Sequence, residues 1–540
     1  MRKPKAALTV LGVAVIAVAL SSCGGSGGKE GGTLTGSYAF FPEYLDPALS
    51  YEQEGWLAMY DTYLPLLTYR HANGVEGSEV VPALAESLPK VTDGGKTYTL
   101  TLRKGLRYSD GTPVKASDFA STVERVFKLN SPGSSFYEDI AGAEEFAKTK
   151  SGGISGIETD DATGKITIHL NEPRGTFTNE LAMLFVALLP PNTPAKNMTT
   201  DPPPATGPYM ITKSEPGKGW AYARNPQWAK SNAASIPEVP SGHVDKSEIS
   251  VVHNKATQVN EIERDKTDWM QTTIPADLYA NVKDRYEGTQ FRVEHPISTY
   301  FFWMNTQKPP FNDLKVRQAV NYAINSAALE RIYAGSLSAT HQILPEGMPG
   351  HEAFDLYPHD MAKAKKLFAE ANPSDRNITV WTDSESPNNE AGAYYESVLN
   401  ELGFHAKLKT LGSNYFGVIS NRSTPDLDTG WADWLQDYPH PNDFFEPLLD
   451  GKSIQPTGNT NLSNMNDPKL NEKIARLDTQ QLGPQQEKEY AALDREFMAQ
   501  APMAPYGSIT TSTFVDSEID LGKVIYNPTM GQDLTSFQFK

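Results

Sequence analysis

Cysteine is almost absent from this sequence: Cys23 is the only one among 540 residues, so no disulfide within the chain can support its fold. Burial of apolar side chains must then stabilise the folded body, and a chain of this length can form two or three domains. Long apolar runs are also missing after residue 20. We therefore expect no membrane-spanning helix in the body of the chain.

Positive charge is scarce relative to negative charge. The sequence has 48 basic and 66 acidic residues, a formal net charge of −18 at pH 7. Nucleic acids and anionic membrane surfaces attract basic patches, so this charge argues against both as direct partners. The ten histidines are scattered, without a spacing typical of a metal site. We predict no metal, no cofactor and no nucleic-acid partner.

The start of the chain has the pattern of an export signal. Three basic residues precede an apolar stretch from Ala6 to Leu20, and Ser-Ser-Cys follows. A cysteine at this place resembles the bacterial lipobox, in which the sulfur takes a diacylglycerol and the chain is cut before it. We predict a signal peptide over 1–22, lipidation of Cys23 and a flexible tether over 23–33. The alternative is a secreted protein with an unused thiol.

The first half of the body contains predicted strands with a helix between them. Apolar residues alternate over 98–102 and over 166–170, as in half-buried strands. Ser117 or Asp118 is predicted to cap the helix between these strands. The proline-rich segment 201–205 is predicted to connect two domains.

The second half of the body alternates helical and extended patterns. The predicted elements are helix 361–371, strand 378–381, helix 389–402 and strand 406–411. Ahead of them, Asn312 or Asp313 is predicted to cap a helix whose apolar face runs from Val316 to Ala327. Such helix–strand alternation predicts an α/β fold with a mostly parallel sheet covered by helices.

Ordered sequence blocks cover nearly the whole chain after its apolar start. They are PALAESL at 82–88, DGGKTY at 93–98, LRKGLRYSDGTPV at 102–114, TGPY at 206–209, PFND at 310–313, VRQAVNYAI at 316–324 and WADWLQDYPHP at 431–441. In order and spacing, these blocks resemble the family 5 extracellular solute-binding proteins of ABC importers, the oligopeptide- and dipeptide-binding group. A single block would be a weak signal, but so many in register are a strong one.

The resemblance implies a two-lobed fold of the periplasmic-binding-protein type (type II, cluster C) with an extra third domain. The implied ranges are 34–68, 201–298 and 506–540 for lobe I, 69–200 for the extra domain, and 299–505 for lobe II. The two chain crossings between the lobes would form a hinge, which allows rigid-body closure around a ligand.

The last block contains the predicted ligand anchor. In oligopeptide-binding relatives, an aspartate in a Trp-x-x-Asp-Tyr-x-x-Pro arrangement holds the α-ammonium of the peptide. Trp434, Asp437, Tyr438 and Pro441 fit that spacing, so the resemblance implies this role for Asp437. A carboxylate in a closed, poorly hydrated cleft binds ammonium through charge-assisted hydrogen bonds. Asp433 is the alternative anchor, and either carboxylate could instead cap a loop.

Further ligand-binding candidates are mostly aromatic. Aromatic faces accept varied side chains without fixed hydrogen bonds, which suits a peptide pocket. The candidates are Trp431, Trp434 and Tyr415 as pocket walls, Tyr51 and Glu52 from a loop that relatives place beside the ligand backbone, and Phe136 and Tyr137 from the extra domain. Each of the last four could equally belong to the core.

The resemblance implies an exported, lipid-anchored, monomeric protein on the outer face of the cell membrane. It would capture peptides and deliver them to the permease and ATPase subunits of an ABC importer, without catalytic residues of its own. An oligosaccharide, opine, metal chelate or signalling peptide is the alternative ligand. An exported hydrolase is disfavoured, since the Ser-x-x-Lys match at 87–90 lacks its partner motifs. A surface scaffold without an importer is the remaining alternative.

Overall fold

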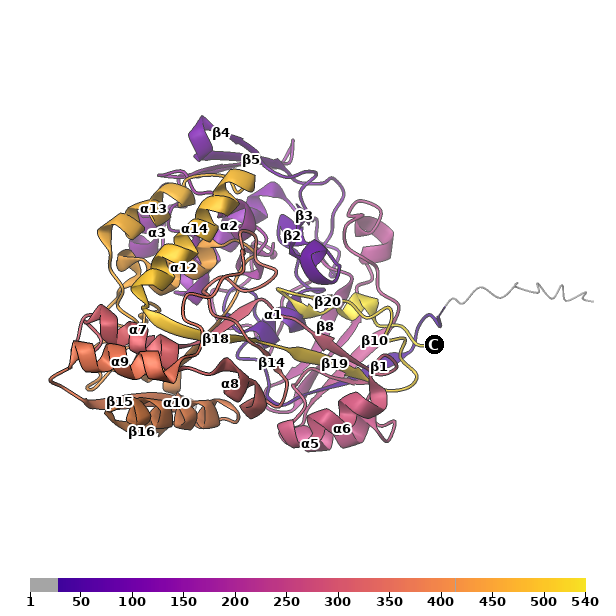
Figure 1. Ribbon diagram of the computed structural model, residues 1–540. Coiled ribbons are helices and arrows are strands. Elements are labelled where there is room, and N and C mark those ends of the chain that lie inside the picture. Colours follow the sequence, from indigo (N-terminus) through magenta and orange to yellow (C-terminus); the bar gives the residue numbers. More distant parts are fainter. Residues whose placement is uncertain (1–27, 413) are drawn as a thin grey trace, which may run out of the picture.

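The computed structural model describes residues 28–412 and 414–540. The predicted signal peptide, Cys23 and the next four residues of the predicted tether lie outside the described residues. Among those described, no helix is both long and apolar enough to cross a membrane. The described chain folds around separate sheets with helices on their faces (Figure 1).

Lobe I, as we call the part built on the largest sheet, has parallel strands at its centre. The strands in sheet order are β12 (Phe291–Glu294), β19 (Thr511–Val515), β11 (Trp269–Met270), β1 (Thr33–Tyr38), β10 (Lys246–Val251), β9 (Gly219–Arg224) and β8 (Tyr209–Glu215). β1 pairs in parallel with β10 and β11, and the outer pairs are antiparallel. Helices α5 (Lys255–Ile262) and α6 (Ala276–Tyr286) bury apolar side chains against β12 and β19.

Lobe II contains a second mixed sheet. Its strands in sheet order are β14 (Leu337–Ser338), β18 (Met503–Ile509), β13 (Ser298–Met304), β17 (Thr429–Leu435), β15 (Asn377–Asp383) and β16 (His405–Leu411). Its helices are α7 (Leu314–Ala323), α8 (Ser326–Ile332), α9 (Met361–Ala371), α10 (Asn388–Leu402), α11 (Tyr415–Ile419), α12 (Asn442–Leu449), α13 (Pro468–Asp478) and α14 (Pro484–Gln500). Its core is one continuous apolar cluster.

The predicted mostly parallel sheet is wrong for half of lobe II. β15 pairs in parallel with β16 and β17, as the helix–strand alternation predicts. β13 and β18 are antiparallel to their neighbours because they are the strands by which the chain enters and leaves the lobe. The predicted helix through Ala327 is also broken: α7, capped by Asp313, ends at Ala323, and Asn325 caps α8.

The extra domain is a small antiparallel sheet covered by helices. Its elements are β4 (Lys90–Thr92), β5 (Thr97–Thr101), α2 (Ala116–Lys128), α3 (Ala143–Thr149), β6 (Ile157–Asp160), β7 (Lys165–His169) and α4 (Phe177–Glu180). The predicted caps of α2 are wrong. Lys115 is the N-cap, and Asp118 stands three residues into the helix, where its carboxylate accepts the Lys115 backbone N–H at 2.9 Å.

A buried ion pair fastens the extra domain to lobe I. Both terminal guanidinium nitrogens of Arg125 on α2 donate to the carboxylate of Asp46, at 2.8 and 2.6 Å. The backbone N–H of Met198 donates to the same carboxylate at 3.0 Å. One apolar cluster also runs through both parts, so lobe I and the extra domain share a core. The remaining short elements are α1 (Gln53–Met59), β2 (Leu67–Tyr69), β3 (Val80–Pro82), β20 (Tyr526–Asn527) and β21 (Gly531–Gln532).

Two neighbouring segments connect the sheets of lobes I and II. One runs from β12 to β13 between Glu294 and Ser298, and the other from β18 to β19 between Ile509 and Thr511. The Ser298 and Ser508 hydroxyls lie 3.2 Å apart at the lobe II end of these segments. The predicted lobe boundaries at 299 and 505 fall inside β13 and β18, within a few residues of the observed crossings.

Candidate functional site

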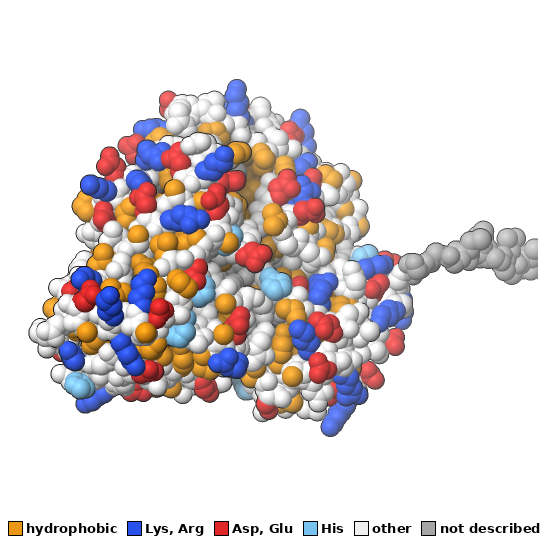
Figure 2. Space-filling model, in the orientation of Figure 1, with side chains coloured by type: hydrophobic (Ala, Val, Ile, Leu, Met, Phe, Trp, Pro, Cys, Tyr) orange, Lys and Arg blue, Asp and Glu red, His pale blue; other side chains and the backbone are white. Residues whose placement is uncertain are grey.

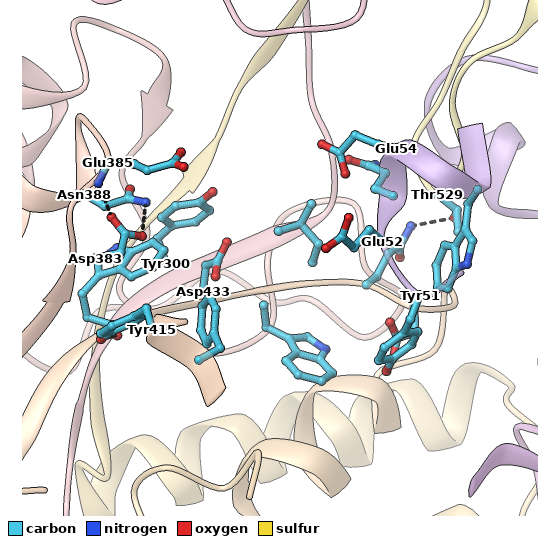
Figure 3. Close-up of a pocket in the computed structure, with 18 of the residues that line it drawn as sticks. Tyr51, Glu52, Glu54, Tyr300, Asp383, Glu385, Asn388, Tyr415, Asp433 and Thr529 are labelled. Carbon is cyan, nitrogen blue, oxygen red and sulfur yellow. Dashed lines mark hydrogen bonds between the residues drawn. The ribbon is translucent and has the colours of Figure 1, made fainter. Parts of the chain in front are cut away.

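A cavity of about 680 Å³ lies where lobe I faces lobe II. Lobe I contributes α1 with the two residues before it, together with Thr529, and lobe II contributes β13 and the ends of β15 and β17 (Figure 3). Cavities of this size are typical of sites for small-molecule ligands, which favour boundaries between domains. The cavity is therefore the candidate ligand site.

Most of the predicted site residues meet in this cavity. Those that line it are Tyr51, Glu52, Tyr415, Trp431, Asp433, Trp434 and Asp437. Lining residues that the sequence analysis missed include Glu54, Trp56, Tyr300, Asp383, Glu385, Asn388, Phe416 and Gln436. Asp383 could have been found, because it follows a predicted strand and ligands bind beyond the carboxyl ends of such strands. The others have no pattern that separates them from ordinary surface or core residues.

Asp437 bridges the two lobes. The hydroxyl of Tyr51, just before α1, donates to the Asp437 carboxylate at 2.7 Å. The Asp437 backbone N–H donates to the carboxylate of Asp443 at 2.9 Å, which fixes the loop after β17. Burial raises the pKa of Asp437 to about 7, and the hydrogen bond from Tyr51 opposes that rise.

A second group of polar side chains surrounds Asp433. In the β13–β17 pairing Tyr300 stands opposite Asp433, and both residues line the cavity. Asp383 lies on the same side of the cavity and accepts a hydrogen bond from Asn388 at 3.0 Å (Figure 3). Burial raises the pKa of Asp433 to about 6, the Tyr300 hydroxyl lowers it, and the charge of Asp383 raises it further.

Aromatic side chains from lobe II form another part of the cavity lining. Trp431 is buried, and its indole N–H donates to the Tyr506 hydroxyl at 2.9 Å. The Tyr415 hydroxyl donates to the backbone carbonyl of Trp431 at 2.5 Å. Phe416 remains 48% exposed beside the Trp431 ring, with 6.0 Å between ring centroids. An exposed aromatic ring at a cavity mouth offers a contact surface for a ligand.

Two further cavities adjoin the central one at the lobe boundary. One, of about 480 Å³, shares Tyr51, Trp434 and Asp437 with it and reaches Phe136 and Tyr438. The other, of about 570 Å³, shares Glu52 and Tyr300 and reaches Lys255, among other residues. Both cavities thus share lining residues with the central one and adjoin it along the lobe boundary.

Tyr137 differs from the other predicted site residues. It lines none of the three cavities described above, is fully buried and donates its hydroxyl hydrogen to the Glu180 carbonyl at 2.9 Å. Its aromatic neighbour Phe136 faces Tyr438 across the lobe boundary, with ring centroids 6.2 Å apart. Tyr137 thus supports Phe136 from the core of the extra domain.

One compact group of potential metal ligands occurs among the described residues, and it lies outside the cavities. The group consists of Asp61, His71 and Asp533. All three residues are buried, and their potential ligand atoms lie within 4.8 Å of one another. His71 Nδ1 lies 2.6 Å from the Asp533 carboxylate, and Asp61 accepts the backbone N–H of Leu534 at 2.9 Å. These bonds attach the C-terminal segment to lobe I, which gives the group a structural role.

Comparison with known proteins places the chain in a family. The model for the middle region of the bacterial extracellular solute-binding proteins, family 5, matches residues 79–456. The chain is 24% identical over 414 residues to the probable D,D-dipeptide-binding periplasmic protein of Escherichia coli K12, covering 74% of each chain. It is 26% identical over 426 residues to heme-binding protein A of Haemophilus influenzae, again covering 74% of each.

Solved structures confirm the predicted two-lobed fold. Clavulanic acid biosynthesis oligopeptide binding protein 2 aligns with a TM-score of 0.86 at 24% identity, covering 95% of this chain and 96% of that one. A periplasmic binding protein of Helicobacter pylori in complex with the peptide STSA aligns with a TM-score of 0.75 at 20% identity, covering 95% and 98%. With the family model matching well over half of its length, this chain belongs to the family 5 bacterial extracellular solute-binding proteins, as the sequence blocks predict.

Proposed function

We propose that this protein captures peptides in the cavity between its lobes and delivers them to the permease of an ABC importer. The observation that best supports this is the position of Asp437: the predicted ammonium anchor lies in the cavity and is hydrogen-bonded to the opposite lobe. Two relatives agree with this ligand class: one is named as a probable D,D-dipeptide-binding protein, and the other was solved in complex with the peptide STSA.

In this proposal the α-ammonium of the peptide binds Asp437 in place of, or beside, the Tyr51 hydroxyl. A cation strongly stabilises a half-buried carboxylate in such a site, because its charge compensates for the hydration that the carboxylate lost on burial. The aromatic wall from Trp431 to Phe416 accepts the peptide side chains through apolar contact. Asp433 is the alternative anchor, since it lines the same cavity.

The protein performs no chemistry in this account. Peptide binding closes the lobes about the two connecting segments, and the closed form engages the permease, while ATPase subunits supply the energy. The protein acts as a monomer outside the cell membrane and is held there by a lipid on Cys23. Replacing that sulfur, as Cys23→Ser, is expected to release a folded protein with unchanged peptide affinity into the soluble fraction.

Native mass spectrometry of the purified protein tests the ligand class. A closed cleft retains its ligand during purification, so we expect the native protein to be heavier than its sequence by the mass of a ligand. Denaturation should release this ligand, and its fragmentation spectrum should be that of a peptide. Adding a tripeptide mixture to the emptied protein should then restore the bound state, and titration calorimetry should detect the heat of binding. A released sugar or heme, together with no heat from any peptide, would show that the ligand is not a peptide.

A further inference from the structure

The cavity between the lobes is lined by charge of a single sign. Six carboxylates line it, and its lining contains no Lys, Arg or His among the residues that the structure describes. The six are Glu52, Glu54, Asp383, Glu385, Asp433 and Asp437. Acidic and basic side chains are instead mixed over the outer face that is visible in Figure 2. The acidic lining of the cavity therefore differs from the mixed charge of this outer face.

Three of these carboxylates form two separate poles. One is Asp437, which Tyr51 contacts at the lobe I side of the cavity. The other is Asp433 with Asp383, beside Tyr300 on the lobe II side (Figure 3). The α-ammonium of a peptide can occupy only one pole. The second pole would then remain a pair of like charges without a counter-ion, which is unfavourable in a poorly hydrated cavity.

The neutral groups of the lining also favour a ligand that donates hydrogen bonds. Gln436 is 5% exposed, and its amide N–H donates to the Thr529 hydroxyl at 2.8 Å. Its carbonyl oxygen has no hydrogen-bond partner among the described residues, although the residue lines the cavity. Ammonium and guanidinium groups only donate hydrogen bonds, so they complement a lining rich in acceptors.

The aromatic wall suits a cation as well. Tyr415 and Trp431 line the cavity with their ring centroids 6.0 Å apart, and the flat guanidinium group stacks favourably on such rings. Basic side chains line the adjoining cavities instead, with Lys255 in one and Arg174 and Lys452 in the other. A ligand carboxylate would therefore be accommodated beyond the central cavity rather than within it.

We propose that the cavity selects cationic peptides, with the basic side chain of an arginine or lysine bound at the Asp433–Asp383 pole and the α-ammonium at Asp437. This inference rests on the proposed peptide function and specifies its substrate class. Acidic peptides are excluded, because a carboxylate in the central cavity would meet six acidic side chains and no basic one.

Titration calorimetry of the emptied full-length protein can test this with alanine tripeptides that contain one arginine, citrulline or glutamate at each position in turn. Citrulline keeps the shape of arginine without its charge. We expect the best arginine peptide to bind at least about tenfold more tightly than its citrulline counterpart, and the glutamate peptides to bind most weakly. Raising the salt concentration should reduce the advantage of arginine.

Two variants test whether the preference for arginine over citrulline arises at the Asp433–Asp383 pole. Asp433→Asn should reduce the ratio of arginine to citrulline affinity to about one while retaining citrulline binding. Asp284→Asn, an exposed carboxylate on α6, loses the same charge outside the cavity and should leave the ratio unchanged. A ratio that Asp433→Asn does not alter in a variant with a normal unfolding temperature would overturn the assignment of this pole.

The outcomes separate this inference from the proposed function. Equal affinities for arginine, citrulline and glutamate peptides in the unaltered protein overturn the charge selection but leave peptide binding intact. If no tripeptide binds, the peptide function fails, and free L-arginine compared with L-citrulline decides the inference. Binding of arginine alone would support selection for cations, whereas equal binding or none would overturn it.

Discussion

At the residue scale, the hydrogen bond between Tyr51 and Asp437 joins the proposed ligand anchor to the opposite lobe. It joins side chains that are far apart in sequence and belong to opposite lobes, at 2.7 Å. Burial raises the pKa of Asp437 to about 7, so this carboxyl group titrates near neutral pH. Only its ionised form attracts an ammonium group, and the affinity for a peptide should therefore depend on pH.

Tyr51→Phe should shift that pH dependence. The Tyr51 hydroxyl stabilises the charged carboxylate and so lowers its pKa, which means that its loss raises the pKa further. Peptide affinity falls as pH drops through the pKa of Asp437, by up to about tenfold per pH unit. In the variant this fall should begin at higher pH. Calorimetric titrations between pH 5 and 8.5 measure it, and superimposable profiles would contradict the role of Tyr51.

The block at 431–441 contains enough information to predict both aspartates of the site, because a short segment with fixed spacing holds them. Glu54 and Glu385 could not be predicted in the same way. Each is an ordinary acidic residue in its own segment, and only the facing of α1 and the segment after β15 across the lobe boundary brings them together. The acidic character of the cavity is therefore a tertiary property that no single segment reveals.

At the element scale, the sequence predicts helices better than strand directions. α9 has the predicted bounds, and α10 starts one residue early, because their apolar periodicity and flanking turns are local. The direction of β13 relative to β17 depends on where the chain crosses between lobes, which lies outside the helix–strand alternation. The predicted N-cap of α2 is wrong because Asp118 lies at the third position of the helix rather than at its N-cap. An acidic side chain suits this third position as well as the N-cap, since it can accept the backbone N–H of the capping residue.

The ion pair between Asp46 and Arg125 should be important for the stability of lobe I and the extra domain together. Removing one partner leaves a buried charge uncompensated, so Asp46→Ala is expected to lower the free energy of unfolding by about 3–5 kcal/mol. Urea denaturation followed by circular dichroism measures this change. Glu144→Ala breaks an exposed pair on α3 and serves as the control with little effect. Equal, small effects of both variants would contradict a structural role for the buried pair.

At the scale of the whole molecule, two lobes joined by two neighbouring segments favour rigid-body closure. The segments 294–298 and 509–511 lie side by side, since they connect strands that are paired in both sheets. The cavity lining comes from both lobes, so closure completes the site and separation of the lobes opens it. Ligand binding and lobe position are thus coupled through the same contacts.

Peptide binding should therefore make the molecule more compact. We expect the radius of gyration of the emptied protein, measured by small-angle X-ray scattering, to fall when a saturating tripeptide is added. Asp437→Asn should require a higher peptide concentration for the same change, because it weakens binding without altering the connecting segments. A radius that stays constant while calorimetry shows full binding would contradict closure about these segments.

The measurement that tests the central claim most directly compares a free tripeptide with its N-acetylated form in the unaltered protein and in Asp437→Asn. Acetylation removes the α-ammonium and leaves the rest of the peptide unchanged. The account predicts that acetylation weakens binding to the unaltered protein at least about tenfold and has little further effect on the variant, because both changes remove the same ion pair. Equal binding of free and acetylated peptides by the unaltered protein would contradict it.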